Sequence, residues 1–196
     1  LCKHSLLSGK RVAALIRLAR LSGQISSRAA TVKDTYMARN DHLKYQVYRS
    51  EAFKQALQLL EEEQQEMERP DIDVDRVRLT PISSVAIDGS YNWGETEFNW
   101  EDVAKWKTKW PKGIDIALWF DQELCGMCYA NPRDSKITIK IILLEGKPDK
   151  THPLKGYVLP ISLTAIDAYA RMLGCHFIEI QEPSADCIPW YEENGF

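Results

Sequence analysis

Three runs of apolar and β-branched residues follow one another closely in the middle of the chain. The first two, residues 114–120 and 124–130, flank the polar residues 121–123, and the third covers residues 137–144. Apolar runs of this length predict β-strands, and the short polar loop predicts that the first two form a hairpin. The third run becomes continuously apolar toward its end, which is typical of a strand covered on both faces. The sequence therefore predicts a sheet at the centre of the fold.

Further helices and strands are predicted on both sides of these runs. Asn99 is suited to be the N-cap of a helix that extends to Trp110, and Phe98 and Val103 are spaced as a hydrophobic staple. The other predicted elements are a strand at 77–82, a helix at 160–173 that Gly174 ends, a strand at 176–181 and a short helix around Trp190. This part of the chain is thus predicted to mix helices and strands.

The first seventy residues have a helical pattern instead. One amphipathic helix is predicted near residues 12–19, and a second over residues 42–69, which a proline follows. The tract 61–66 is polar almost throughout, so we expect the second helix to be exposed on most of its surface. The predicted organisation is a helical extension over residues 1–70, followed by a domain over residues 71–196.

Charge is divided unevenly along the chain. Residues 1–50 carry ten lysines and arginines and two acidic residues, whereas the rest carries 15 basic and 26 acidic residues, so the formal net charge is only −3. A basic N-terminal arm of this kind can bind nucleic acid or dock on an acidic protein partner. The alternative is that these cations form the solvated face of the helices, which is the more common use of such a pattern.

Membrane and metal sites are not expected. No apolar run approaches the roughly 20 residues that a membrane-spanning helix needs. The five cysteines lack the spacing of a disulfide framework, which favours a cytoplasmic location. Cys125 and Cys128 form a C-x-x-C, but we expect residues three apart on a strand to point to opposite faces. No second pair or histidine is spaced to complete a metal site, so no metal is predicted.

The last residues of the sequence carry a recognisable motif. The chain ends with Trp190-Tyr191-Glu192-Glu193-Asn194-Gly195-Phe196, one short helix after the predicted strand at 176–181. This ending is similar to the Tyr-x-x-x-Gly-Phe signature of the GNAT superfamily, the Gcn5-related N-acetyltransferases. The order of elements, and the glycine in the strand after the hairpin loop, Gly126, also resemble that family over about residues 76–196. The resemblance implies an α/β (α+β) fold with a mixed, mainly antiparallel sheet and flanking helices, preceded here by the N-terminal helical extension.

The resemblance also implies acetyl-CoA as co-substrate. In the family, the end of the fourth strand and the helix that follows it hold this molecule. The matching positions here are Leu143, Leu144, Lys155, Gly156, Tyr157, Val158 and Ser184. A pyrophosphate at such a helix N-terminus meets free backbone N–H groups and the positive end of the helix dipole.

The implied catalytic residues are one tyrosine and two glutamates. Transfer of an acetyl group to an amine needs the uncharged amine, so a base or a water relay is useful. The family pattern places the general acid at Tyr191 and the base at Glu145 or Glu179, with Glu179 on the same face of its strand as Phe177 and Gln181. The alternatives are solvated glutamates and a packed tyrosine. Four tryptophans, which can contact an acceptor but more often pack in a core, are Trp93, Trp100, Trp106 and Trp110.

The predicted function is an acetyl-CoA-dependent N-acetyltransferase that acts on an unidentified amine by direct attack. The alternative is a catalytically inactive GNAT-like module, structural or binding, in a nucleic-acid or phage-particle assembly. Val158 stands where the family loop has a small residue, which favours the alternative, whereas Tyr191 favours the enzyme. As a phage or mobile-element protein the chain would be virion-associated rather than cytoplasmic.

Two further readings involve partners. A nucleic-acid-modifying member of the same fold would use the basic arm on phosphates. The family continues with further strands where this sequence ends at Phe196, so we expect either that the chain is truncated or that the strand at 176–181 has an open edge. A second chain can pair with such an edge in an oligomer.

Overall fold

The computed structural model describes residues 41–68, 70–135, 137–149, 151–183, 185 and 188–193. The amphipathic helix predicted near residues 12–19 and most of the basic arm lie outside this set. The described elements are, in chain order, α3 (Asp41–Glu66), η1 (Val74–Arg76), β1 (Val77–Thr80), α4 (Ser84–Tyr91), α5 (Glu101–Lys109), β2 (Ile114–Phe120), β3 (Glu123–Pro132), β4 (Thr138–Gly146), α6 (Val158–Leu173), β5 (Phe177–Ile180) and α7 (Ile188–Glu193).

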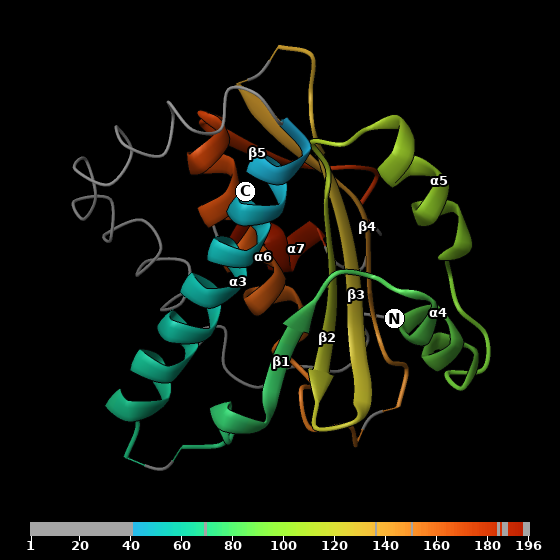
Figure 1. The fold of residues 1–196 in the computed structure, drawn as a ribbon. Coiled ribbons are helices and arrows are strands. Elements are labelled where there is room, and N and C mark those ends of the chain that lie inside the picture. The colour runs from blue at the N-terminus through green and yellow to red at the C-terminus, as the bar shows by residue number, and fades with distance from the viewer. Residues whose placement is uncertain are drawn as a thin grey trace.

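The five strands form one sheet in the order β1-β2-β3-β4-β5 (Figure 1). The first three pairs are antiparallel and β4 pairs with β5 in parallel, so the fold is a mixed, mainly antiparallel sheet with flanking helices, as predicted. The predicted hairpin is confirmed, because β2 and β3 are joined through Asp121 and Gln122. Asp121 has a positive φ of 52°, and its carboxylate pairs with Arg76.

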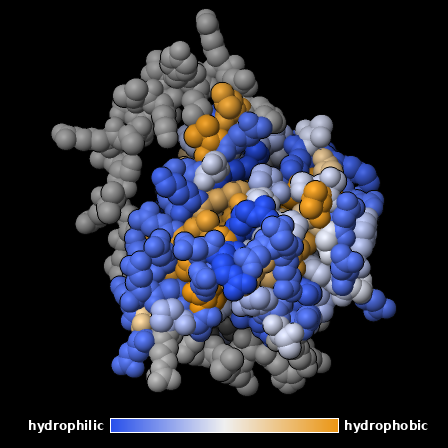
Figure 2. Space-filling model, turned by 60° about the horizontal axis from the view of Figure 1, so that its bottom comes forward, coloured by the Kyte–Doolittle hydropathy of each residue, from blue (hydrophilic) through white to orange (hydrophobic). Residues whose placement is uncertain are grey.

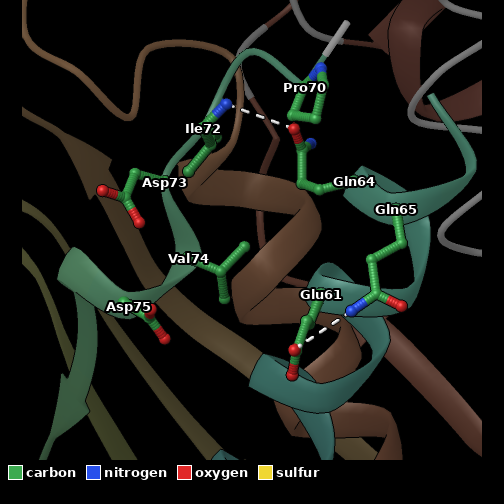
Figure 3. A pocket seen from close by; sticks show the side chains of 8 residues that line it. All are labelled: Glu61, Gln64, Gln65, Pro70, Ile72, Asp73, Val74 and Asp75. Atoms are coloured by element: carbon green, nitrogen blue, oxygen red, sulfur yellow. Dashed lines mark hydrogen bonds between the residues drawn. The ribbon is translucent and has the colours of Figure 1, made fainter. Parts of the chain in front are cut away.

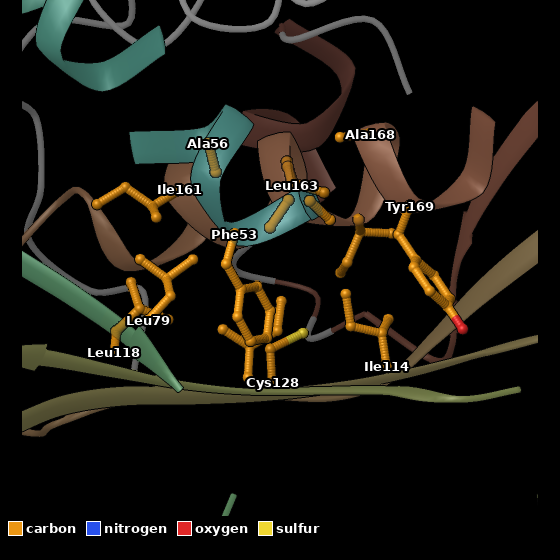
Figure 4. Packing of buried hydrophobic residues seen from close by; sticks show 14 of the residues in the cluster. Phe53, Ala56, Leu79, Ile114, Leu118, Cys128, Ile161, Leu163, Ala168 and Tyr169 are labelled. Atoms are coloured by element: carbon orange, nitrogen blue, oxygen red, sulfur yellow. The ribbon is translucent and has the colours of Figure 1, made fainter. Parts of the chain in front are cut away.

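Helices α3 and α6 pack on one face of the sheet (Figure 1). Phe53 of α3, Cys128 of β3 and Leu163 of α6 belong to a single buried cluster (Figure 4). The expectation that residues 42–69 are exposed on most of their surface is wrong, because one side of α3 is buried in this cluster. The chain before and after Pro70 therefore contributes to one hydrophobic core.

Helices α4 and α5 cover the opposite face (Figure 1). Trp93 and Trp100 are buried there, so core packing is confirmed for both. Helix α5 begins one residue later than predicted, with Trp100 rather than Asn99 as its N-cap, although Asn99 Oδ1 still accepts the Glu101 N–H at 3.2 Å. None of the described helices is long and apolar enough to cross a membrane.

An irregularity in the β2–β3 pair changes the direction of Cys125. Gly126 is paired with Leu118 and Leu124 with Trp119, so Cys125 is an extra residue on β3. Cys125 and Cys128 consequently belong to the same buried cluster, and the prediction that they point to opposite faces is wrong. Among the described residues, no three His, Cys, Asp or Glu side chains gather in a way that could hold a metal ion.

Candidate functional site

Strands β4 and β5 separate part of the way along β4. They pair from Thr138 to Ile141, and the last contact is the Gln181 N–H to the Ile141 carbonyl at 2.9 Å. Strand β4 continues to Gly146, paired in this stretch with β3 alone among the described strands. Backbone groups on its other edge are therefore available to an extended ligand, as at any open strand edge.

The N-terminus of α6 lies beside the end of β4. The chain enters the helix through Gly156 in the left-handed conformation (φ 85°), and the Tyr157 N–H donates to Leu154. No backbone carbonyl of the described residues accepts from the Val158 or Leu159 N–H, and the first turn holds no acidic residue. These two N–H donors, the helix dipole and the neighbouring Lys155 together favour an anion here.

The side chain of Val158 packs against the sheet. It packs over Gly126 of β3, where a Cβ atom would clash with it, and lies near Gly146 of β4. Val158 and Leu143 are both buried, and Leu144 is partly buried against the main cluster. All three residues were predicted to bind the cofactor. Because the side chains of Val158 and Leu143 are buried, these two residues can contact a ligand mainly through their backbone groups.

Tyr157 points toward α3. Its hydroxyl donates a hydrogen bond of 2.6 Å to Asp71 Oδ1. Burial and this acidic partner raise the pKa of Tyr157 to about 12. The tyrosine thus stays protonated at neutral pH and ties the start of α6 to the segment that follows α3.

The loop between β4 and α6 is fixed to the β2–β3 hairpin. The Lys147 N–H donates to the Cys125 carbonyl at 2.9 Å, and Lys147 Nζ lies 2.6 Å from Glu123 Oε1. His152 is buried in the loop, and burial lowers its pKa. These contacts set the position from which Gly156 leads into α6.

On the face that comes forward in Figure 2, apolar residues form a strip with hydrophilic surface around it.

Tyr191, the predicted acid, lies on α7 and is partly buried. Burial and the nearby Cys128 thiol raise its pKa. Cys128 is paired with Leu144, so Tyr191 lies near the stretch of β4 that β5 does not cover. The predicted cofactor residue Ser184 lies outside the described residues.

Glu145 is the most enclosed of the predicted site residues that carry charge. Its side chain is on the α4–α5 face of the sheet and 5% exposed. Oε1 accepts the Glu97 N–H and Oε2 accepts the Trp100 indole N–H, both at 2.8 Å. The sequence did not indicate these two partners, since they precede Glu145 by 48 and 45 residues.

Glu179 lies in a different, more exposed setting. Its Oε1 is 2.6 Å from an Arg133 guanidinium nitrogen and 3.8 Å from Lys140 Nζ. Ile178 packs against the main cluster, so Glu179 is on the other face of β5, as its alternation predicted. Lys140 is its partner in the sheet, which places Glu145 about 16 Å farther along β4. The structure therefore does not bring the two glutamates together.

A surface pocket of about 310 Å³ lies elsewhere, between the end of α3 and the segment before β1 (Figure 3). Gln64 stands at its wall, and its Oε1 accepts the Ile72 N–H at 3.1 Å (Figure 3). Three carboxylates line this pocket, those of Glu61, Asp73 and Asp75. No predicted site residue belongs to its lining.

Comparison with known proteins gives likeness in structure only. No protein-family model matches the chain, and no curated protein matches its sequence. The fold is similar to that of AAC(6')-Iy, solved in complex with the bisubstrate analogue CoA-S-monomethyl-acetylneamine. The TM-score is 0.44 and the identity 10%, and the match covers 61% of this chain and 90% of that one.

Proposed function

We propose that the chain is an acetyl-CoA-dependent N-acetyltransferase that transfers the acetyl group to an amine by direct attack. The observation that carries this proposal is the parting of β4 and β5 after Ile141, next to the N-terminus of α6. An extended amide chain fits an open strand edge, and a pyrophosphate fits a helix N-terminus. Acetyl-CoA carries both groups in one molecule.

In this proposal the backbone binds the cofactor. The Val158 and Leu159 N–H groups and Lys155 take the pyrophosphate, while the β4 edge near Leu143 and Leu144 takes the pantetheine arm. Helix α6 has no acidic residue in its first turn to repel phosphate. The side chain of Val158 points to Gly126, which leaves the N–H side of the turn free of it.

The transfer needs an uncharged amine and a proton for the leaving thiolate. The nitrogen lone pair attacks the thioester carbonyl, the C–S bond breaks, and the phenol of Tyr191 protonates the sulfur. The proton that the amine loses passes through water to Glu145 or Glu179. The raised pKa of Tyr191 suits an acid, because the phenol is protonated at neutral pH.

Calorimetric titration with acetyl-CoA tests this proposal. We expect binding to the wild-type chain, and an affinity at least about tenfold lower for Lys155→Glu, since a charge-assisted hydrogen bond contributes about 1.5–3 kcal/mol. Lys54→Glu is the matched control, because Lys54 is exposed on α3 and makes no ion pair among the described residues. Its affinity should equal that of the wild type.

A second candidate is a GNAT-like binding module without turnover. Pro160 favours it, since a proline in the first turn of α6 removes one N–H donor from the anion site. In this case the basic residues of the first fifty would dock on nucleic acid or on an acidic protein partner. Absence of acetyl-CoA binding to the wild type, with salt-sensitive binding to nucleic acid, would select this candidate.

A further inference from the structure

Both carboxylate oxygens of Glu145 accept hydrogen bonds from one segment of the chain. That segment, residues 92–100, connects α4 to α5 and crosses over the end of β4. Its Glu97 N–H and its Trp100 indole N–H each donate a hydrogen bond of 2.8 Å to Glu145. Trp100 is 2% exposed, so neither the indole nor the carboxylate has ready access to water.

The electrostatics of Glu145 make these two bonds important. None of the ion pairs among the described residues includes Glu145. A buried carboxylate without a cation depends on N–H donors to offset the cost of its desolvation. Losing one donor would leave the charge with half of the hydrogen bonds that the described residues give it, so the segment and the carboxylate hold each other in place.

The rest of the segment is held to β3. The Trp93 indole N–H donates to the Leu124 carbonyl at 3.1 Å. Between these anchors, Gly94 and Glu95 are exposed. The segment is therefore a surface loop with fixed ends, and Glu145 provides the fixed end at β4.

We infer that Glu145 is a positioning residue, which holds residues 92–100 at the open end of β4, and that it is not the group that takes the proton from the amine. This inference rests on the proposed function, which names Glu145 and Glu179 as the two candidates for the base. A base must receive a proton on a reachable oxygen, whereas both oxygens of Glu145 already face N–H donors. Glu179 is then the remaining candidate for the base.

Nitrogen-15 NMR of the tryptophan side chains and hydrogen exchange test this inference without any ligand. Trp100→Phe identifies the Trp100 indole signal. In Glu145→Gln one acceptor oxygen is replaced by an amide group that presents N–H to an N–H donor. We expect the indole signal of Trp100 to move, and exchange in a peptide covering residues 94–100 to become at least about tenfold faster. Exchange in β2 should not change.

The controls separate this role from a general loss of stability. Glu123→Gln, on the neighbouring strand β3, alters an ion pair with Lys147 and should leave the Trp100 signal unmoved. Trp100→Phe, which keeps the ring and removes one donor, should reproduce the faster exchange if Glu145→Gln does not fold. An unmoved indole signal with unchanged exchange in Glu145→Gln would overturn the inference.

Titration with acetyl-CoA separates the two proposals. Failure of the wild-type chain to bind would end the proposed acetyltransferase but would leave the NMR and exchange results to decide the role of Glu145. If the wild type binds, Glu145→Gln should bind with an affinity within about twofold, because Glu145 lies on the face of the sheet opposite α6. A loss of more than about tenfold would show that Glu145 belongs to the cofactor site and would overturn the inference.

Discussion

Cγ1 of Val158 occupies the space that a Cβ atom at Gly126 would need, so the first turn of α6 and strand β3 touch with no side chain on the strand. A Cβ at Gly146 would lie 3.6 Å from Val158 Cγ2, an ordinary van der Waals contact, so the close approach depends on Gly126. The position of the proposed anion site depends on this close packing. Adding one methyl group at position 126 should therefore disturb this packing.

Gly126→Ala should destabilise the fold by about 1–3 kcal/mol, the usual cost of overpacking a well-filled core. Val158→Ala alone should cost roughly 2 kcal/mol through the loss of buried methyl groups. In the double variant the two closest clashing methyl groups are gone and only the Cβ of residue 158, at 3.2 Å, remains near the alanine at 126, so this alanine should add less than about 1 kcal/mol to the cost of Val158→Ala. Urea unfolding of the four proteins measures this coupling, and strictly additive costs would contradict the contact.

Asp115→Ala should be among the most destabilising single changes. Asp115 is 1% exposed, and its Oδ2 accepts hydrogen bonds of 2.7 Å from both Lys107 Nζ and the Ile82 N–H. We expect a loss of about 2–4 kcal/mol, since a buried N–H and a partly buried cation lose their acceptor. Asp102→Ala, which breaks the exposed pair with Lys105, should cost far less, because exposed ion pairs contribute little to stability. Equal losses in thermal unfolding would refute this contrast.

Cys125 should make the stability depend on alkaline pH. Burial raises the pKa of its thiol from 9.0 to about 11. The contribution of this thiol to the free energy of unfolding is fully present below pH 9, where the thiol is neutral in the folded and the unfolded chain. It is lost as the pH rises to 11, because in this interval the thiol ionises only in the unfolded chain. Two pKa units correspond to about 2–3 kcal/mol. Denaturant titrations at pH 8 and at pH 11 measure how much free energy of unfolding is lost between the two pH values. This loss should be smaller in Cys125→Ala than in the wild type by the amount given above. Equal losses in the two proteins would disprove the assignment.

Glu179→Gln should separate stability from activity. The pair with Arg133 is about half exposed, so its loss should change the free energy of unfolding by less than about 1 kcal/mol. If Glu179 relays the proton, the rate of acetyl transfer at neutral pH should fall about a hundredfold or more and recover at high pH, where the amine is uncharged. Release of free CoA in the presence of a panel of amines measures this rate. An unchanged rate would show that Glu179 is not the base and would leave the proton to water alone.

The strands were the part of the fold that the sequence predicted best. Alternation and length identify the β2–β3 hairpin, β4 and β5, and the apolar spacing identifies α6. Helix α4 was not predicted, because eight residues that include two serines and Gly89 have little helix propensity, and packing against β3 stabilises them instead. Such stabilisation by tertiary contacts leaves no periodic signal.

The burial of α3 was missed for a related reason. Its polar tract suggested an exposed surface, yet the Gln64 carboxamide is buried because Oε1 accepts the Asp71 and Ile72 N–H groups. A polar side chain can be buried when it satisfies backbone groups that follow a turn. The sequence shows the residue type but not the partner.

Prediction of the site was limited by long-range contacts. Tyr191 lies on the expected helix, and Gly156 has the left-handed conformation that a close approach before α6 requires. The partners of Glu145 and the Arg133–Glu179 pair join segments at least 45 residues apart. One sequence without a structure contains no signal for such pairs.

The order in which the sheet assembles follows from the parallel pairing of β5. Strands β2, β3 and β4 succeed one another through short connections, whereas β5 reaches β4 only after the chain has passed through α6. Contacts between segments far apart in sequence form late, since closing the longer loop costs more entropy. With four residues at an edge, β5 is also among the elements expected to detach first in native-state fluctuations. Strand β5 can thus detach while the antiparallel strands remain folded, and a long, flexible ligand can then reach the edge of β4 where the two strands separate.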